Sequence, residues 1–430
     1  MTRRLLACLA GCGLIMSHAG VAGELTVFCS SSGTEMALCQ SESQSWARET
    51  GNVVKLVPLP SDWGTVLPLY RQLLAASDPV VDVLVMDGTW VGSLAPMLGA
   101  LERKPDDADL MPAPFASAGR RVALPWYRDV GLLFYRRDLL EKYRLPVPQS
   151  WDELEREALL VQAAERRTGQ SALWGYVWQG RTAESLLCNA LEWLGPQGGT
   201  LVPGTGQAGI DNPAARSALS RAARWVGTIS PEGVLSDDEE AARGAFQTGH
   251  AVFMRNWVYA WALANDPQSV VAGKVGVAPL PRERSIELPG GVDGTVYLGI
   301  ARNTRHPAEA ASLIRYLTSR PVERARAAAG AYVPARRSLL DDPDVLAAIP
   351  VLTKIRPVFE APLMRPVAET GQDYPRLAWM VENSFHDVLR GQRSAPDALR
   401  ALSDTVEAMA LRGQWLSGPT AALPPQEKTE

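Results

Sequence analysis

Histidine, cysteine and long hydrophobic runs are scarce in this chain of 430 residues. It has four histidines and five cysteines, and only His250, His306 and His386 among the histidines lie beyond the first 23 residues. These three are far apart and have no neighbouring ligand residues, so neither a zinc or iron site nor a cofactor is expected. No run of about 18 apolar residues follows the N-terminal segment, which argues against a membrane span.

Common catalytic motifs are also missing. The chain has neither a Gly-x-Ser-x-Gly nucleophile elbow nor a phosphate-binding Walker loop. The spacing Gly204-x-Gly206-x-x-Gly209 matches a dinucleotide fingerprint, but no buried strand leads into it and Asn212-Pro213 follows before any helix. We therefore predict a hairpin loop there. The acidic run 237–240 is predicted to begin a helix, where the helix dipole favours negative charge.

The first 23 residues have the order of a secretory signal peptide. Arg3-Arg4 precede an apolar segment over 5–16, and small residues at 21–23 precede Glu24, as a cleavage site requires. We predict that residues 1–23 are removed and that the protein works in the periplasm. The alternative is lipid anchoring at Cys12, because Leu9-Ala10-Gly11-Cys12 resembles a lipidation box.

The charge of the remaining chain is mildly acidic. The signal segment holds two of the 43 basic residues and none of the 47 acidic ones, so the remainder carries a formal charge of −6. A chain of this charge does not attract nucleic acid, and no such partner is expected.

Cys29, Cys39 and Cys188 remain after the signal peptide, and an exported protein meets oxidising conditions. Cys29 is predicted near the end of a strand and Cys39 about two turns into the next helix, so a disulfide between them is geometrically possible. The alternative is that all three are small core residues. The odd cysteine, Cys188, is expected to stay a buried thiol.

Short apolar strands alternate with helices, which predicts an α/β fold with parallel strands. The strands fall into two groups, with 25–28, 53–57 and 80–86 in the first and 130–135, 251–254 and 275–279 in the second. Segments near 122–130, 279–296 and 330–336 cross between the groups. Several crossings indicate two lobes that can hinge. We assign 24–127 and 283–330 to lobe 1, 128–282 and 331–416 to lobe 2, and 417–430 to a flexible tail.

Tryptophan is abundant, with 13 residues against seven phenylalanines. Several tryptophans adjoin polar groups near predicted strand ends, namely Trp90, Trp126, Trp178 and Trp257. Aromatic faces stack on sugar rings, while carboxylates and guanidinium groups bind hydroxyls through charge-assisted hydrogen bonds. The pattern favours a carbohydrate cleft, and the alternative for each ring is core packing.

These motifs resemble the periplasmic solute-binding proteins of carbohydrate ABC importers, in the maltose/trehalose-binding group. The resemblance rests on 85–92 (VMDGTWVG), 124–143, 175–180 (GYVWQG), 255–261 (RNWVYAW) and 274–281 (KVGVAPLP), and it covers nearly all of 24–415. It implies a type II periplasmic binding protein fold, in which two hinged α/β lobes enclose a ligand cleft.

The resemblance also implies a set of sugar-binding residues. Glu35 and Asp87 match acids of lobe 1, and Tyr127 and Asp129 match an aromatic and an acid at the lobe junction. Further matches in lobe 2 or at its border are Tyr259, Trp257, Arg365 and Gly294. The chain departs from the family where Gly294-Thr295-Val296 stands in place of Gly-Gly-Trp, and Trp63 is a candidate replacement ring.

The predicted function is capture of a maltose- or trehalose-like disaccharide and delivery to an inner-membrane ABC permease by a monomeric protein that is not an enzyme. One alternative is a binding protein for another solute, such as a polyol, a glycerophospho compound or a longer glycan. A second is an exported glycoside hydrolase, which would need two carboxyl groups about 5–10 Å apart, for example Asp87 and Asp129.

Overall fold

The structure is a computed structural model that describes residues 23–30, 33–60, 63–76, 80–111, 116–117, 120–195, 201–202, 209–282 and 290–413. The predicted signal peptide, apart from Gly23, and the predicted tail lie outside these residues, as does most of the predicted 204–209 loop.

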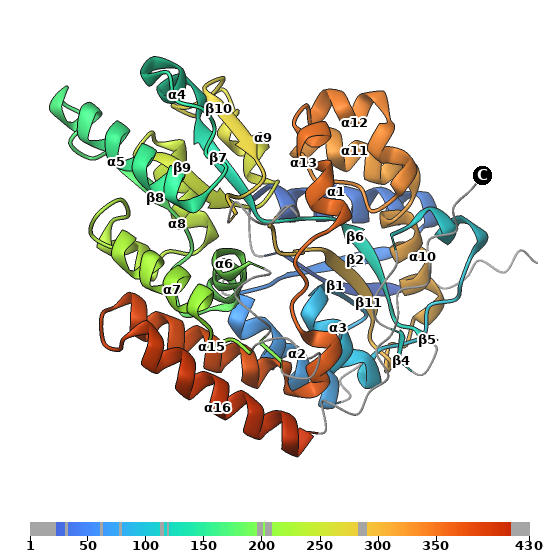
Figure 1. Ribbon diagram of the computed structural model, residues 1–430. Helices are drawn as coiled ribbons and strands as arrows, with labels where there is room; N and C mark the ends of the chain where they lie inside the picture. The colour runs from blue at the N-terminus through green and yellow to red at the C-terminus, as the bar shows by residue number, and fades with distance from the viewer. Residues whose placement is uncertain are drawn as a thin grey trace, which may run out of the picture.

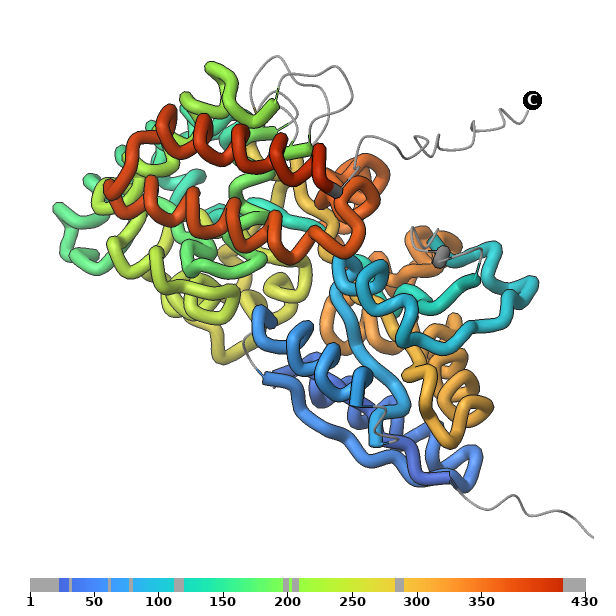
Figure 2. The backbone as a smooth tube through the Cα atoms, turned by 90° about the horizontal axis from the view of Figure 1, so that it is seen from below, coloured from blue at the N-terminus to red at the C-terminus, as the bar shows by residue number. Residues whose placement is uncertain are grey.

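Two lobes, each built on its own sheet, form the molecule (Figure 1). The first sheet has the order β2-β1-β3-β11-β6 and the second β10-β7-β9-β8. The tube view separates the blue and orange lobe from the green, yellow and red one (Figure 2). The predicted two-lobed α/β fold is therefore confirmed. The lobe boundaries stay a prediction, although every strand of the first sheet falls in predicted lobe 1 and every strand of the second in predicted lobe 2.

Both sheets are mixed, and the expectation of parallel strands was only partly right. In the first sheet β1 pairs in parallel with β2 and β3, whereas β11 runs antiparallel to both β3 and β6. The reason is that β11 enters lobe 1 from the lobe junction, opposite to β3. The strands are β1 (Glu24–Cys29), β2 (Val53–Pro58), β3 (Val83–Asp87), β6 (Ala123–Tyr127), β11 (Val296–Ile300), β7 (Leu132–Arg136), β8 (Trp174–Val177), β9 (Ala251–Asn256), β10 (Val275–Ala278), and a separate pair, β4 (Ala116–Ser117) and β5 (Arg120–Arg121).

Helices cover both sheets. Those associated with the first are α1 (Gly33–Thr50), α2 (Trp63–Ala75), α3 (Gly88–Leu94), α10 (Pro307–Leu317) and α11 (Arg320–Gly330). Those in the second block are α4 (Arg137–Tyr143), α5 (Trp151–Arg167), α6 (Glu184–Leu194), α7 (Pro213–Trp225), α8 (Glu239–Gln247) and α9 (Ala260–Ala264). The described part of the chain ends with α12 (Pro343–Ala348), α13 (Leu352–Glu360), α14 (Val367–Thr370), α15 (Tyr374–Leu389) and α16 (Ala395–Gly413), and α15 packs on α6 and α7 (Figure 1).

Helix starts follow the sequence closely. At α5, the Ser150 side chain accepts a hydrogen bond from the Glu153 amide, and the Glu153 carboxylate accepts one from the Ser150 amide. This reciprocal capping satisfies two amides that would otherwise lack partners. At α8, Asp238 accepts from the amides of Glu240 and Ala241, so the acidic run does begin a helix as predicted.

The structure shows which cysteines are bonded to each other. Cys29 and Cys39 form a disulfide, with 6.4 Å between their Cα atoms, and Cys188 is a buried thiol as expected. Most of the tryptophans singled out above belong to the core, because Trp90, Trp126 and Trp178 are buried. For these three the core alternative was correct.

The segments that join the lobes lie side by side and bond to one another. The amide of Arg128 donates to the carbonyl of Val333 (2.8 Å), and that of Gly131 donates to Val292 (3.1 Å). A fourth segment joins them, since the Leu363 amide donates to Gly291 (2.8 Å). The lobe junction is therefore a small hydrogen-bonded unit rather than a set of independent linkers.

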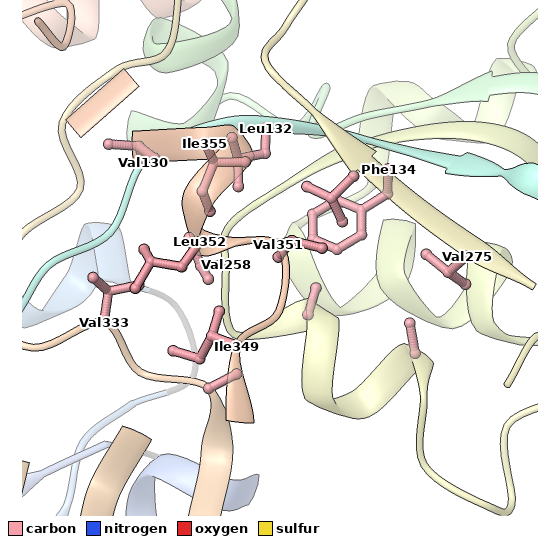
Figure 3. Close-up of a cluster of buried hydrophobic side chains, with 14 of the residues drawn as sticks. Val130, Leu132, Phe134, Val258, Val275, Val333, Ile349, Val351, Leu352 and Ile355 are labelled. Atoms are coloured by element: carbon pink, nitrogen blue, oxygen red, sulfur yellow. The ribbon is translucent and has the colours of Figure 1, made fainter. Parts of the chain in front are cut away.

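A hydrophobic cluster supports this junction from the lobe 2 side (Figure 3). It joins Val130 and Val333 of the crossings to Leu132 and Phe134 of β7, and to side chains that follow α12, such as Ile355. All of these are buried, so separating the crossings from lobe 2 would expose apolar surface and is disfavoured.

A buried ion pair fixes the junction to lobe 2. Arg255, at the end of β9, donates from Nε and Nη2 to both oxygens of Glu192 (2.8 and 2.6 Å). Glu192 also accepts from the amide of Val292 (3.1 Å). Both charged side chains are almost completely buried, and a Cβ at Gly131 would overlap the Glu192 carboxylate. The pair therefore requires glycine at position 131.

We predict that Gly131→Ala destabilises the protein by about 3 kcal/mol or more, because it forces the buried pair apart or displaces the crossing. Urea unfolding measures the change. Gly233→Ala is the matched control, since nothing lies within 4 Å of a Cβ there. Equal unfolding midpoints for the two variants would contradict this account of the junction.

Candidate functional site

Polar and aromatic side chains gather at one edge of the first sheet. Asp87 ends β3 and Tyr127 ends β6, and Val296, the first residue of β11, pairs with both. Glu35 lies in the first turn of α1, just beyond the end of β1. The carboxyl ends of parallel strands meet at one edge, which is where ligands bind in open α/β sheets.

Glu35 and Tyr127 are in direct contact. The Tyr127 hydroxyl donates to the Glu35 carboxylate (2.9 Å), and its ring meets Tyr332 edge-on with centroids 4.8 Å apart. Burial raises the pKa of Glu35 above its usual value. Tyr332 was not predicted as a site residue, although it lies in the predicted crossing 330–336.

Arg365 connects the two lobes. Its Nη2 donates to Asp87 at the edge of lobe 1 (3.1 Å) and to the Asp293 carbonyl of the crossing (3.0 Å). Its Nη1 donates to Glu184 at the start of α6 (3.1 Å). The Arg365 side chain is 5% exposed, so these contacts are only weakly screened by solvent.

The acids around Arg365 have further partners. Asp87 accepts from the amide and the hydroxyl of Thr89 (2.7 and 2.6 Å), which caps α3. Glu184 also accepts from the hydroxyl of Tyr374, and burial raises the pKa of Glu184. Burial likewise raises the pKa of Asp293, whose carboxylate accepts from Thr295 (2.7 Å).

Asp129 lies at the junction, as predicted, and is buried there. Its Oδ1 accepts from the amides of Val130 (2.9 Å) and Val258 (2.8 Å), and its carbonyl accepts from Gly294 (2.9 Å). Asp129 therefore ties the first crossing to the β9–α9 turn and to the crossing before β11. One carboxylate oxygen is committed to the backbone, and burial raises the pKa of Asp129 to about 8.

Trp257 and Gly294 form a close contact between lobe 2 and a crossing. The Arg255 guanidinium carbon lies 3.9 Å from the Trp257 ring centroid, and the indole NH donates to Glu239 (3.3 Å). A Cβ at position 294 would lie 2.7 Å from the ring, so only glycine fits there. One face of the Trp257 ring is thus covered by Arg255, which limits the area left for stacking.

The remaining two predicted rings lie in different surroundings. The Tyr259 hydroxyl donates to Glu240 (2.7 Å), and its ring packs against the lobe 1 cluster that includes Tyr127 and Tyr332. Trp63, at the start of α2, packs on Trp90 with centroids 5.1 Å apart and touches the same lobe 1 cluster. That cluster also contains Val296.

The structure thus brings most predicted residues to the two lobe edges and the junction, and it adds Glu184, Asp293, Glu239, Glu240 and Tyr332. Asp293 had a signal, since it lies in a Gly-rich segment directly before a strand. Glu184 and Glu239 had none, because acids in a first helical turn are ordinary helix residues.

Comparison with known proteins decides the family. Residues 32–323 match the family of bacterial extracellular solute-binding proteins. A Deinococcus radiodurans relative, named "Probable ABC transporter-binding protein", is 36% identical over 397 residues, 90% of this chain and 94% of the relative. The chain belongs to this family. As a solute-binding protein it is a non-enzymatic component of ABC transport that binds a small solute, and the glycoside hydrolase alternative is set aside.

Solved structures agree with this membership. Maltose-bound T. maritima MalE3 is 32% identical to this solute-binding protein, with a TM-score of 0.84 over 90% of this chain and 100% of that one. The acarbose-binding GacH receptor of Streptomyces glaucescens has a TM-score of 0.78 over 92% and 99% of the two chains. It is 23% identical, so that likeness shows the fold alone. No helix among the described residues is long and apolar enough to span a membrane.

The raised pKa of Asp129 implies that the free energy of unfolding depends on pH. Because its pKa is about 8 in the folded protein and lower when unfolded, the folded state binds more protons between about pH 4 and pH 8. The free energy of unfolding should fall as pH rises through this window, by up to about 1.4 kcal/mol per pH unit from this group. Asp129→Asn should weaken the dependence in urea unfolding at pH 5 to 8. The exposed Asp404→Asn should not, and parallel curves for all three proteins would contradict the assignment.

Proposed function

We propose that this solute-binding protein captures a disaccharide of the maltose or trehalose type between its lobes and delivers it to an inner-membrane ABC permease. The observation that carries the proposal is Arg365, which contacts Asp87 of lobe 1 and Glu184 of lobe 2. A ligand bound at this point meets charged groups of both lobes.

The residue types suit a sugar. Carboxylates accept from hydroxyl groups through charge-assisted bonds, and Glu35 and Asp87 supply them from lobe 1. Tyr259 supplies an aromatic ring from lobe 2, close to Tyr127 and Tyr332. The maltose-bound relative, at 32% identity, supports the disaccharide class.

The charges argue against the glycerophospho alternative. Anionic ligands require several free cations. The two Nη atoms of Arg365 already donate to the carboxylates of Asp87 and Glu184 and to the Asp293 carbonyl. Arg128 donates to the Phe359 carbonyl, and its guanidinium carbon lies 4.8 Å from the centroid of the Phe359 ring. Arg181 lies 3.9 Å from Asp238. Acids therefore outnumber cations around the site, which favours a neutral ligand. A polyol or a longer glycan remains the second candidate.

The mechanism we propose is closure around the ligand. A sugar that contacts both lobes binds the closed form more tightly than the open one and shifts the population toward closure. The closed form then docks on the permease. The predicted signal peptide 1–23 delivers the monomeric protein to the periplasm, with anchoring at Cys12 as the alternative.

The direct test is a thermal-shift screen of residues 24–430 against trehalose, maltose, sucrose, cellobiose, xylobiose and glycerol phosphate. A ligand at 100 times its dissociation constant stabilises the folded state by about 2.7 kcal/mol, which such a screen detects. We expect a shift with an α-linked disaccharide and none with glycerol phosphate. No rise in the unfolding temperature with any sugar, or a rise with glycerol phosphate alone, would contradict the proposal.

Glu35→Ala should then weaken binding of the active sugar by about ten- to a hundredfold, because a buried charge-assisted hydrogen bond contributes about 1.5–3 kcal/mol. Isothermal titration calorimetry measures the loss. Glu102→Ala removes an exposed carboxylate of lobe 1 and should leave affinity within about twofold of the unmodified protein. An unchanged affinity in Glu35→Ala would show that this acid does not contact the sugar.

Trp63 is proposed to replace the stacking ring that Val296 does not supply, since both touch the same lobe 1 cluster. Trp63→Ala should lower sugar affinity by about tenfold through loss of ring contact. Adding Val296→Trp should recover part of that loss. If Trp63→Ala binds as tightly as the unmodified protein while remaining folded, Trp63 has no such role.

A further inference from the structure

The Cys29–Cys39 disulfide closes a loop that contains Glu35, one of the proposed sugar-binding acids. Cys29 is the last residue of β1, and Cys39 lies inside α1. The segment between them holds Ser30 and Glu35. The Glu35 carboxylate accepts a hydrogen bond from the Tyr127 hydroxyl (2.9 Å), and the Ser30 hydroxyl, which belongs to the closed loop, lies near enough to lower the pKa of Glu35.

Helix geometry places the second cysteine directly beneath the acid. Residues four apart lie on the same face of a helix, so Cys39 follows Glu35 by one turn on that face. Both cysteines are completely buried. The covalent bond therefore acts one helical turn beyond Glu35.

Apart from Met36 and Leu38, which pack on the lobe 1 cluster beside the acid, the other anchors of α1 lie farther along the helix. Glu42 pairs with the buried Arg326 (2.7 Å), and the Trp46 indole donates to Ser312 (3.1 Å). These contacts hold the middle of the helix two and three turns beyond Glu35. They do not by themselves fix its first turn, which is where helices fray.

We propose that the Cys29–Cys39 disulfide is a positioning device for the ligand site, which holds Ser30 and the first turn of α1 so that Glu35 meets the sugar in a fixed orientation. The role rests on the proposed function of Glu35 in sugar binding. A carboxylate held in place before binding loses less conformational freedom when the ligand arrives, so affinity is higher than for the same acid on a mobile turn.

The test is Cys29→Ala/Cys39→Ala, with two measurements on the folded protein. Calorimetric titration with maltose should show affinity lowered by about three- to tenfold, as expected when one or two side chains must be ordered on binding. Amide hydrogen exchange without sugar should be at least about tenfold faster over 33–38 and unchanged in α15. If the alanine pair does not fold, Cys29→Val/Cys39→Ala fills more of the space and suits the strand, and it takes the same test.

A control variant separates positioning from general destabilisation. Trp46→Phe removes the bond to Ser312 farther along α1. This variant should keep the maltose affinity of the unmodified protein, and exchange over 33–38 should stay slow. Normal exchange and affinity within twofold in the folded double variant would overturn the proposal. If the unmodified protein binds no sugar, the proposed function fails, whereas the exchange measurement still decides whether the disulfide fixes the turn.

Discussion

The shared guanidinium of Arg365 is the contact on which the two-lobed site depends. It meets Asp87, Glu184 and the Asp293 carbonyl, one from each of lobe 1, lobe 2 and a crossing. Two carboxylates around one buried cation leave an excess of negative charge, and a third acid, Asp293, lies nearby with a raised pKa. Such a site disfavours anionic ligands and suits hydroxyl groups, which donate to carboxylates without adding charge.

Buried contacts tie the crossings to lobe 2. The Glu192–Arg255 pair fixes the crossing before β11 to lobe 2, and Asp129 ties that crossing to β6 and to the turn after β9. Because removing one partner of a buried ion pair is costly, this pair anchors the crossing before β11 firmly to lobe 2. In the closure proposed above, lobe 1 changes its angle against the crossings and lobe 2, so the proposed ligand contacts of Glu35 and Asp87 travel together.

The sequence was enough to predict the α/β class and the cap at Ser150, because strands buried on both faces and capping residues leave local signals. It also placed Asp87 after a buried strand and Tyr127 on a crossing between the lobes, through resemblance to a family. It did not reveal that β11 is antiparallel or that Trp126 and Trp178 are core residues, since both depend on contacts distant in the chain. Glu184 was missed for the same reason: only the fold brings it to Arg365.

The most direct test of a single sugar site between the lobes is a crystal structure of the protein grown with the disaccharide that stabilises it most. We expect sugar hydroxyls within hydrogen-bond distance of Glu35 and Asp87 from lobe 1 and of Arg365 at the junction, with Tyr259 against a sugar ring. A sugar that contacts one lobe only, or that binds away from Arg365, would contradict the claim that these residues form one site between the lobes.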